Sequence, residues 1–123
     1  MSTFPDVAVF GEALFDMIQQ PDNSFLPFIG GSPYNVARSF VRQGLACTYL
    51  SPVSTDDLGQ KIYQSALDDG IKLPDSYRST KNTSLALVYK DEKGKPSYRL
   101  YRKGVADLAV SYTHLTLPTN REV

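Results

Sequence analysis

The sequence has few of the residues on which disulfide and metal chemistry depend. It contains one cysteine and one histidine in 123 residues. An internal disulfide is therefore excluded, and a zinc site, which uses several Cys or His ligands, is not expected at His114. Cys47 lies in an apolar stretch and is expected to be a buried, unreactive thiol. A single cysteine also agrees with a reducing compartment, so we expect a cytoplasmic protein.

Excess charge and long apolar runs are also missing. Thirteen basic residues balance thirteen acidic ones, which gives no electrostatic reason to expect a nucleic acid or a membrane surface as a partner. The longest apolar runs fall far short of the roughly 20 residues that span a bilayer. The first six residues show neither the basic nor the apolar region of a secretory signal. The remaining expectation is one small globular domain.

The order of apolar segments predicts an α/β domain. Residues 7–10 form a short continuous apolar run, typical of a strand buried on both faces, and residues 46–53 form a second. Helical spacing of apolar residues follows each run, with Ser32 as the expected cap of the first helix and Ser54 or Thr55 as that of the second. Gly44 and Gly70 are expected to end these helices.

Further short segments predict strands. Residues 85–90 and 97–102 form two extended runs on either side of a turn that contains Gly94, which indicates an antiparallel hairpin with one face covered. Residues 14–18 form another apolar segment, interrupted by Asp16, and residues 25–29 a possible short strand weakened by Pro27. A single hairpin is only marginally stable, so these strands are expected to join a larger sheet or a partner surface.

The last segment, residues 110–123, has no periodicity. Its first ten residues, Val-Ser-Tyr-Thr-His-Leu-Thr-Leu-Pro-Thr, resemble the translation of a sequencing adapter. We therefore expect residues 110–123 to be a non-native tail that takes no part in the fold. The alternative is a genuine irregular tail, which would require a native open reading frame through these codons.

The strongest candidate for a ligand site is the Gly-Gly-Ser-Pro-Tyr-Asn-Val-Ala motif of residues 30–37. Gly30 and Gly31 allow the backbone to approach a ligand closely, and the helix that follows presents free N–H groups. Asn35 lies on its first turn, where its amide can donate and accept hydrogen bonds. The motif could bind a hydroxyl-rich molecule or a phosphate, or the glycines could serve only a tight turn. It matches neither a Walker A loop nor a dinucleotide-binding fingerprint.

The second candidate is Asp16, which follows the first predicted strand closely. Ligands of open α/β sheets bind beyond the carboxyl ends of the strands. A carboxylate there can accept two hydrogen bonds from neighbouring hydroxyl groups of a sugar. The alternative is an exposed loop acid, as most single Asp residues are.

These motifs resemble those of the ribokinase (PfkB) family of carbohydrate kinases, most closely its bacterial fructokinases. Residues 11–16, Gly-Glu-Ala-Leu-Phe-Asp, are similar to the opening motif of fructokinases. Residues 30–37, with Gly44 and the Asp-Asp-Leu-Gly of residues 56–59, are similar to the first family signature. Residues 83–86, 98, 101–102 and 106–107 are similar to the segments that follow. The resemblance runs in order from residue 6 to about residue 109.

The resemblance implies a ribokinase-like three-layer α/β sandwich with a small β-sheet lid. Residues 1–109 would be the N-terminal part of the kinase domain, with lid strands near residues 14–29 and 84–102. Asp16, Gly30, Gly31 and Asn35 would contact the sugar, and Arg102 would reach it from the lid. A homodimer formed through the lid is a further hypothesis.

The second family signature, which carries the Asp that acts as general base, is not found in the sequence. The resemblance therefore places no catalytic residue in this chain, and it places the sites for ATP and Mg²⁺ in a part that follows. Because phosphoryl transfer depends on positioning and charge stabilisation, the chain alone is expected to be inactive.

The sequence thus predicts the sugar-binding half of a kinase that phosphorylates a sugar, with fructose favoured. Ribose, 2-keto-3-deoxygluconate or a nucleoside are alternative substrates. A sugar-binding module without enzymatic activity is an alternative of a different class.

Overall fold

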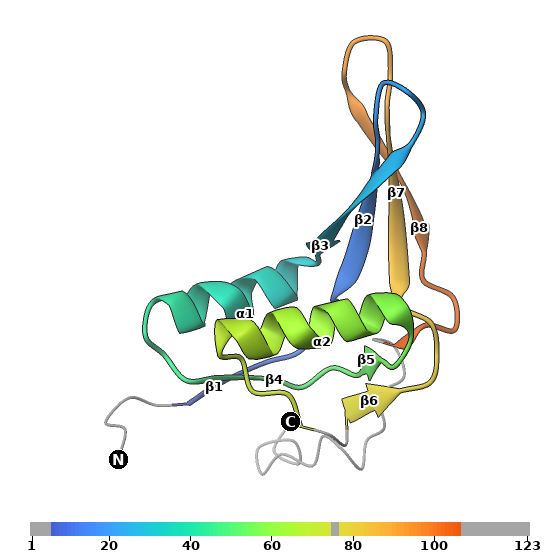
Figure 1. Cartoon of the computed structure of the whole chain (residues 1–123). Helices are drawn as coiled ribbons and strands as arrows, with labels where there is room; N and C mark the ends of the chain where they lie inside the picture. Colours follow the sequence, from blue (N-terminus) through green and yellow to red (C-terminus); the bar gives the residue numbers. More distant parts are fainter. Residues whose placement is uncertain (1–5, 75–76, 107–123) are drawn as a thin grey trace, which may run out of the picture.

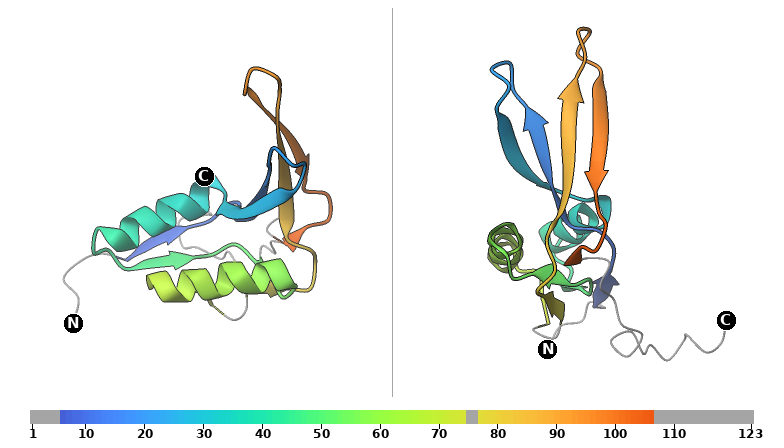
Figure 2. Two further views of the ribbon diagram at one scale, coloured as in Figure 1. Left: turned by 45° about the horizontal axis from the view of Figure 1, so that its top comes forward. Right: turned by 90° about the vertical axis from the view of Figure 1, so that its right-hand side faces the viewer.

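A computed structural model describes residues 6–74 and 77–106. The predicted strand at residues 7–10 is β1 (Val7–Val9), which pairs in parallel with β4 (Cys47–Tyr49). Two helices, α1 (Ser32–Arg42) and α2 (Asp57–Asp69), lie side by side over one face of these strands (Figures 1 and 2). The α/β class predicted from the sequence is confirmed by this arrangement.

The core lies between the helices and the strands. Tyr34 and Ala37 of α1 and Ile62 and Ala66 of α2 are fully or almost fully buried there, together with Cys47. The expectation that Cys47 is buried is therefore confirmed. Within the described residues no helix covers the opposite face of β1, which leaves Phe10 exposed.

The helix ends depart from the sequence prediction at their N-termini. The cap of α1 is Gly31, with no side-chain cap bond, and Ser32 is already helical. The cap of α2 is Asp56, whose carboxylate accepts a hydrogen bond from the Gly59 N–H at 2.7 Å, instead of the predicted Ser54 or Thr55. At the other end of α2, Gly70 adopts the predicted left-handed conformation, with φ 86°.

A four-stranded sheet projects from the part formed by α1, α2, β1 and β4, which we call the body. Its order is β3–β2–β7–β8, so the hairpin of β2 (Leu14–Gln19) and β3 (Phe25–Gly30) joins the hairpin of β7 (Ser84–Lys90) and β8 (Pro96–Tyr101) through parallel β2–β7 pairing. Figure 2 shows the two hairpins rising from the body. Pro27 is accommodated because β3 is an edge strand, where a missing N–H leaves no partner unsatisfied. We call this sheet the lid sheet.

The predicted strand at residues 46–53 is divided in two. β4 ends at Tyr49, and β5 (Val53–Ser54) pairs in parallel with β6 (Arg78–Ser79). Between them Pro52 has no N–H to donate, and the Ser51 side chain bonds to another segment.

No helix of the described residues is long and apolar enough to cross a bilayer. His114, the segment 110–123 and the boundary near residue 109 lie outside the described residues.

Candidate functional site

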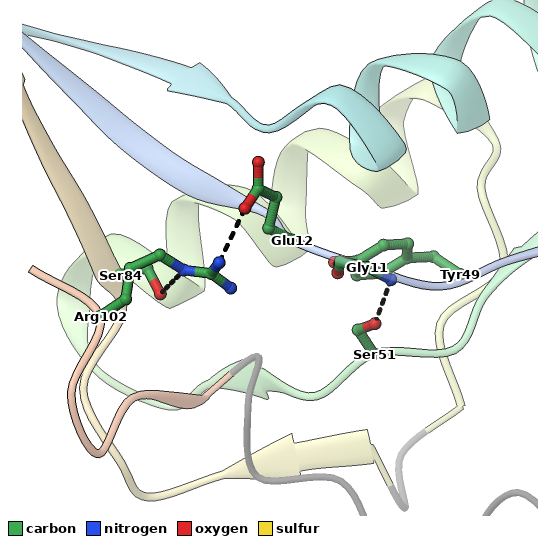
Figure 3. Close-up of polar contacts among 6 residues, drawn as sticks. All are labelled: Gly11, Glu12, Tyr49, Ser51, Ser84 and Arg102. Atoms are coloured by element: carbon green, nitrogen blue, oxygen red, sulfur yellow. Dashed lines mark hydrogen bonds and ion pairs between the residues drawn. The ribbon is translucent and has the colours of Figure 1, made fainter. Parts of the chain in front are cut away.

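The carboxyl end of β1 is held in place through the backbone of Gly11. The Gly11 N–H donates to the Ser51 hydroxyl at 2.6 Å, and its carbonyl accepts a hydrogen bond from the Tyr49 hydroxyl (Figure 3). Gly11 has φ 141°, and a Cβ there would collide with the ring of Pro33. Glu12, the next residue, therefore projects from a fixed point between the body and the lid sheet.

The two glycines of the motif make room for atoms of the protein itself. A Cβ on Gly30 would collide with the carboxylate of Asp16, and a Cβ on Gly31 would collide with the backbone carbonyl of Glu12. Gly30 lies opposite Leu14 in the β2–β3 register, so Asp16, two residues further along β2, has its side chain on the same face. At Gly30 the atoms that a side chain would meet belong to the Asp16 carboxylate; the sequence prediction that Gly30 and Gly31 contact a sugar stays a prediction.

Asp16 lies within β2 and is partly buried, so it is not an exposed loop acid. Burial raises the pKa of its carboxyl above the usual value, and the nearby Glu12 carboxylate raises it further. A carboxylate in this position can accept hydrogen bonds from hydroxyl groups of a ligand, which relieve part of its desolvation.

Arg102 reaches Glu12 from the lid side of the candidate site. Its Nη1 donates to Glu12 Oε2 at 2.8 Å, and its Nε donates to the Ser84 hydroxyl at 3.4 Å (Figure 3). Glu12 follows β1, Ser84 begins β7 and Arg102 follows β8. One ion pair and one weak hydrogen bond thus connect three segments at the base of the lid sheet.

Asn35 is exposed on α1 and is connected to the group through the backbone. Its N–H donates to the Gly31 carbonyl at 3.0 Å. Its side chain lines an open hollow along α1 together with Ser32, Val36, Ser39, Phe40 and Gln43, and Asp16 is not among the lining residues. The structure therefore brings Asp16, Gly30 and Gly31 together, attaches Arg102 through Glu12, and leaves the Asn35 side chain on an adjoining surface.

Asp56 fixes the start of the lid strand β7. Its carboxylate accepts hydrogen bonds from the Thr83 hydroxyl at 2.6 Å and from the Thr83 N–H at 2.8 Å, in addition to the cap bond from Gly59. Burial raises the pKa of the Asp56 carboxyl, but these hydrogen bonds outweigh it and hold the pKa below its usual value. The sequence predicted Asp56 as a helix-end acid, which is confirmed, and gave no indication of its contact with Thr83.

Sequence reasoning also missed the role of Glu12 and Ser84. A signal for Glu12 was available, because it is a charged residue between the apolar residues of β1 and those of β2. Ser84 carried no such signal. Among the described residues no group of three or more His, Cys, Asp or Glu side chains is placed to hold a metal ion.

The motif series and this fold match known carbohydrate kinases. The family model described as pfkB family carbohydrate kinase matches residues 5–117. The chain belongs to this family. It is 30% identical over 115 residues to the 5-dehydro-2-deoxygluconokinase of Clostridium tetani, covering 86% of this chain and 34% of that protein. It is 29% identical over 113 residues to a fructokinase of Escherichia coli, covering 89% and 36%.

Solved structures of the pfkB family agree with the fold. The crystal structure of fructokinase with bound ATP from Xylella fastidiosa superposes with a TM-score of 0.80 and is 33% identical, covering 89% of this chain and 36% of that one. The family resemblance and the ribokinase-like fold predicted from the sequence are both confirmed. The chain spans about a third of the length of each of these three relatives.

Proposed function

We propose that this chain is the sugar-binding part of a longer kinase that transfers the γ-phosphoryl group of ATP to a hydroxyl group of a sugar, with fructose favoured. The observation that carries the proposal is the position of the Asp16 carboxylate. It is packed on Gly30 at the junction of the body and the lid sheet, near Glu12, which in turn pairs with Arg102. A partly desolvated carboxylate can accept hydrogen bonds from sugar hydroxyls and hold them in one orientation.

Each residue of the group has a proposed task. Asp16 accepts hydrogen bonds from sugar hydroxyls, and Arg102 donates one from the lid side. Because Gly30 and Gly31 have no side chains, they leave room for the Asp16 carboxylate and for the Glu12 carbonyl at the site. Asn35, exposed at the first turn of α1, contributes its amide to the rim of the site.

ATP and Mg²⁺ are proposed to bind to a part of the longer protein that follows this chain. The described residues offer no acidic group of the kind that would hold a metal ion, so we assign none of them to the nucleotide or to Mg²⁺. When bound, these groups supply the phosphoryl group and neutralise its developing charge. Fructokinase from Xylella fastidiosa has been crystallised with ATP, which supports the choice of nucleotide.

Two classes of sugar are represented among the relatives. Fructose carries no charge, whereas 5-dehydro-2-deoxygluconate is a sugar acid with a carboxylate. The test is expression of the protein encoded by the complete gene, followed by a coupled ADP-release assay with fructose, ribose and 2-keto-3-deoxygluconate. Turnover of about 1–100 per second with fructose is expected. Sugar binding without phosphorylation would instead favour a binding module. The 123-residue chain alone is expected to give no turnover.

A homodimer through the lid sheet is also proposed. Leu26 and Phe28 of β3 and Tyr98 and Leu100 of β8 are 47%, 48%, 66% and 60% exposed, and the strand register places all four on one face of the sheet. An apolar row of this kind is typical of a protein interface. Light scattering should give a dimer mass for the longer protein and a smaller mass for Leu100→Asp. A wild-type monomer at micromolar concentration would contradict the proposal.

A further inference from the structure

Glu12 presents its carboxylate from a rigid backbone. Its carbonyl lies against Gly31, and the preceding Gly11 is bonded to Tyr49 and Ser51. The side chain reaches Arg102 at 2.8 Å, with side-chain exposures of 35% for Glu12 and 23% for Arg102. An ion pair that is partly shielded from water is screened less by salt than one on the open surface.

The charges at this junction are unequal. Glu12 pairs with the guanidinium of Arg102, and Glu12 is also close enough to Asp16 to raise the pKa of the Asp16 carboxyl, so two carboxylates share one compensating positive charge among the described contacts. The positive charge of Arg102 is already compensated by Glu12. A third anion arriving here would meet more negative than positive charge among the described residues.

We propose that Glu12 is a specificity-determining residue that reserves the site for uncharged sugars and disfavours sugar acids. This inference rests on the proposed function. An uncharged sugar can donate to Asp16 and accept from a guanidinium N–H while the ion pair stays intact. A sugar carboxylate would have to displace Glu12 from Arg102, leaving an unpaired carboxylate beside Asp16, or remain unpaired itself.

The test uses Glu12→Gln in the longer kinase, because an amide carbonyl still accepts a hydrogen bond from Arg102 but carries no charge. The probes are D-fructose and 2-keto-3-deoxygluconate. Dissociation constants are measured by calorimetry without nucleotide, and kcat/KM by the coupled assay. We expect the preference for the acid over fructose to rise roughly tenfold or more, with fructose itself changed by less than about threefold.

The matched control is Glu92→Gln. Glu92 is an exposed acid in the turn between β7 and β8, about 20 Å from the base of the sheet at roughly 3.3 Å per residue. The control removes the same charge and should leave the preference unchanged. In an Arg102→Gln background, Glu12→Gln should change the preference less than it does in the wild type, because no guanidinium is left for the sugar acid to pair with and only the repulsion by Glu12 is removed.

A second measurement needs no variant. In the wild-type protein the affinity for the acid should rise when the salt concentration increases from about 10 mM to about 300 mM, whereas the affinity for fructose should not. An unchanged preference in folded Glu12→Gln, or a wild-type affinity for the acid that falls with salt, would overturn the inference while phosphorylation of fructose still supports the proposed function. A wild type that binds neither sugar would refute both.

Discussion

The packing of the Asp16 carboxylate on Gly30 can be tested without changing Asp16. Gly30→Ala adds one methyl group at a strand position where the backbone does not have positive φ, so an alanine is compatible with the local conformation. The obstacle is the Asp16 carboxylate, which occupies the position of the new Cβ. Because this carboxylate ends a short side chain that can rotate, we expect it to be displaced and the fold to be retained.

The size of the effect follows from the hydrogen bonds that displacement would remove. Hydrogen bonds to charged groups contribute about 1.5–3 kcal/mol each. Loss of one such bond corresponds to roughly a tenfold or greater decrease in kcat/KM for the sugar, and loss of two to a hundredfold or more. Overpacking itself should lower the free energy of unfolding by about 1–3 kcal/mol. The Michaelis constant for ATP should change little.

The assay is steady-state kinetics of the longer kinase with each substrate varied in turn, for Gly30→Ala, Asp16→Ala and the double variant. If Gly30→Ala acts through Asp16, the double variant should be no worse than Asp16→Ala alone. Its unfolding free energy should recover, because the carboxylate that opposed the methyl group is gone. Wild-type sugar kinetics in Gly30→Ala would refute the proposed task of Asp16. If the decreases in kcat/KM of the two single variants multiply in the double variant, the methyl group acts independently of Asp16.

Three further predictions concern the contacts that hold the site. Asp56→Asn should lower the free energy of unfolding by about 2–4 kcal/mol in urea titrations, because hydrogen bonds to a charged acceptor are lost at Thr83; a loss below about 0.5 kcal/mol would contradict this. Since the folded pKa of Asp56 is lowered, its contribution should be complete above the usual value of 3.8 and should disappear as pH falls through the lower folded pKa. The difference between wild type and Asp56→Asn should therefore shrink as the pH is lowered below 3.8; a constant difference would contradict it. Ser51→Ala should cost about 1–3 kcal/mol by leaving the Gly11 N–H unpaired, whereas Arg38→Ala, which removes a partly exposed ion pair with Asp69, should cost less than about 1 kcal/mol in the same titration.

Local patterns in the sequence predicted most of the secondary structure. Two strand-length runs separated by a turn that contains Gly94 identified β7 and β8, and helical spacing with a closing glycine identified α2 up to Gly70. The predicted cap of α2 was wrong because tertiary contacts decide between residues that are equally good caps. Ser54 and Asp56 are both good helix caps, and Asp56 is selected because it also bonds to Thr83, 27 residues away.

The candidate site was predicted in part, and for reasons that the structure changes. Asp16 and the glycine pair were identified by their positions and by the family resemblance. The Asp16 carboxylate occupies the position that a Cβ on Gly30 would take. This contact depends on the register of the β2–β3 hairpin, which the pattern of residues along the sequence does not determine. The Glu12–Arg102 pair spans 90 residues, so no local pattern could have joined its members.

The contacts that join the lid sheet to the body are concentrated at its base. The Glu12–Arg102 pair and the Asp56–Thr83 hydrogen bonds all lie there, whereas every residue of β8 is exposed. Strands with few buried contacts open more readily than the core they are attached to. Asp16 lies in β2 next to Phe15, which is buried in the core, so we expect the base of the sheet to hold it more firmly than the outer part does. Substitutions at the base are expected to change sugar selection, and substitutions near the tip are expected to change it little.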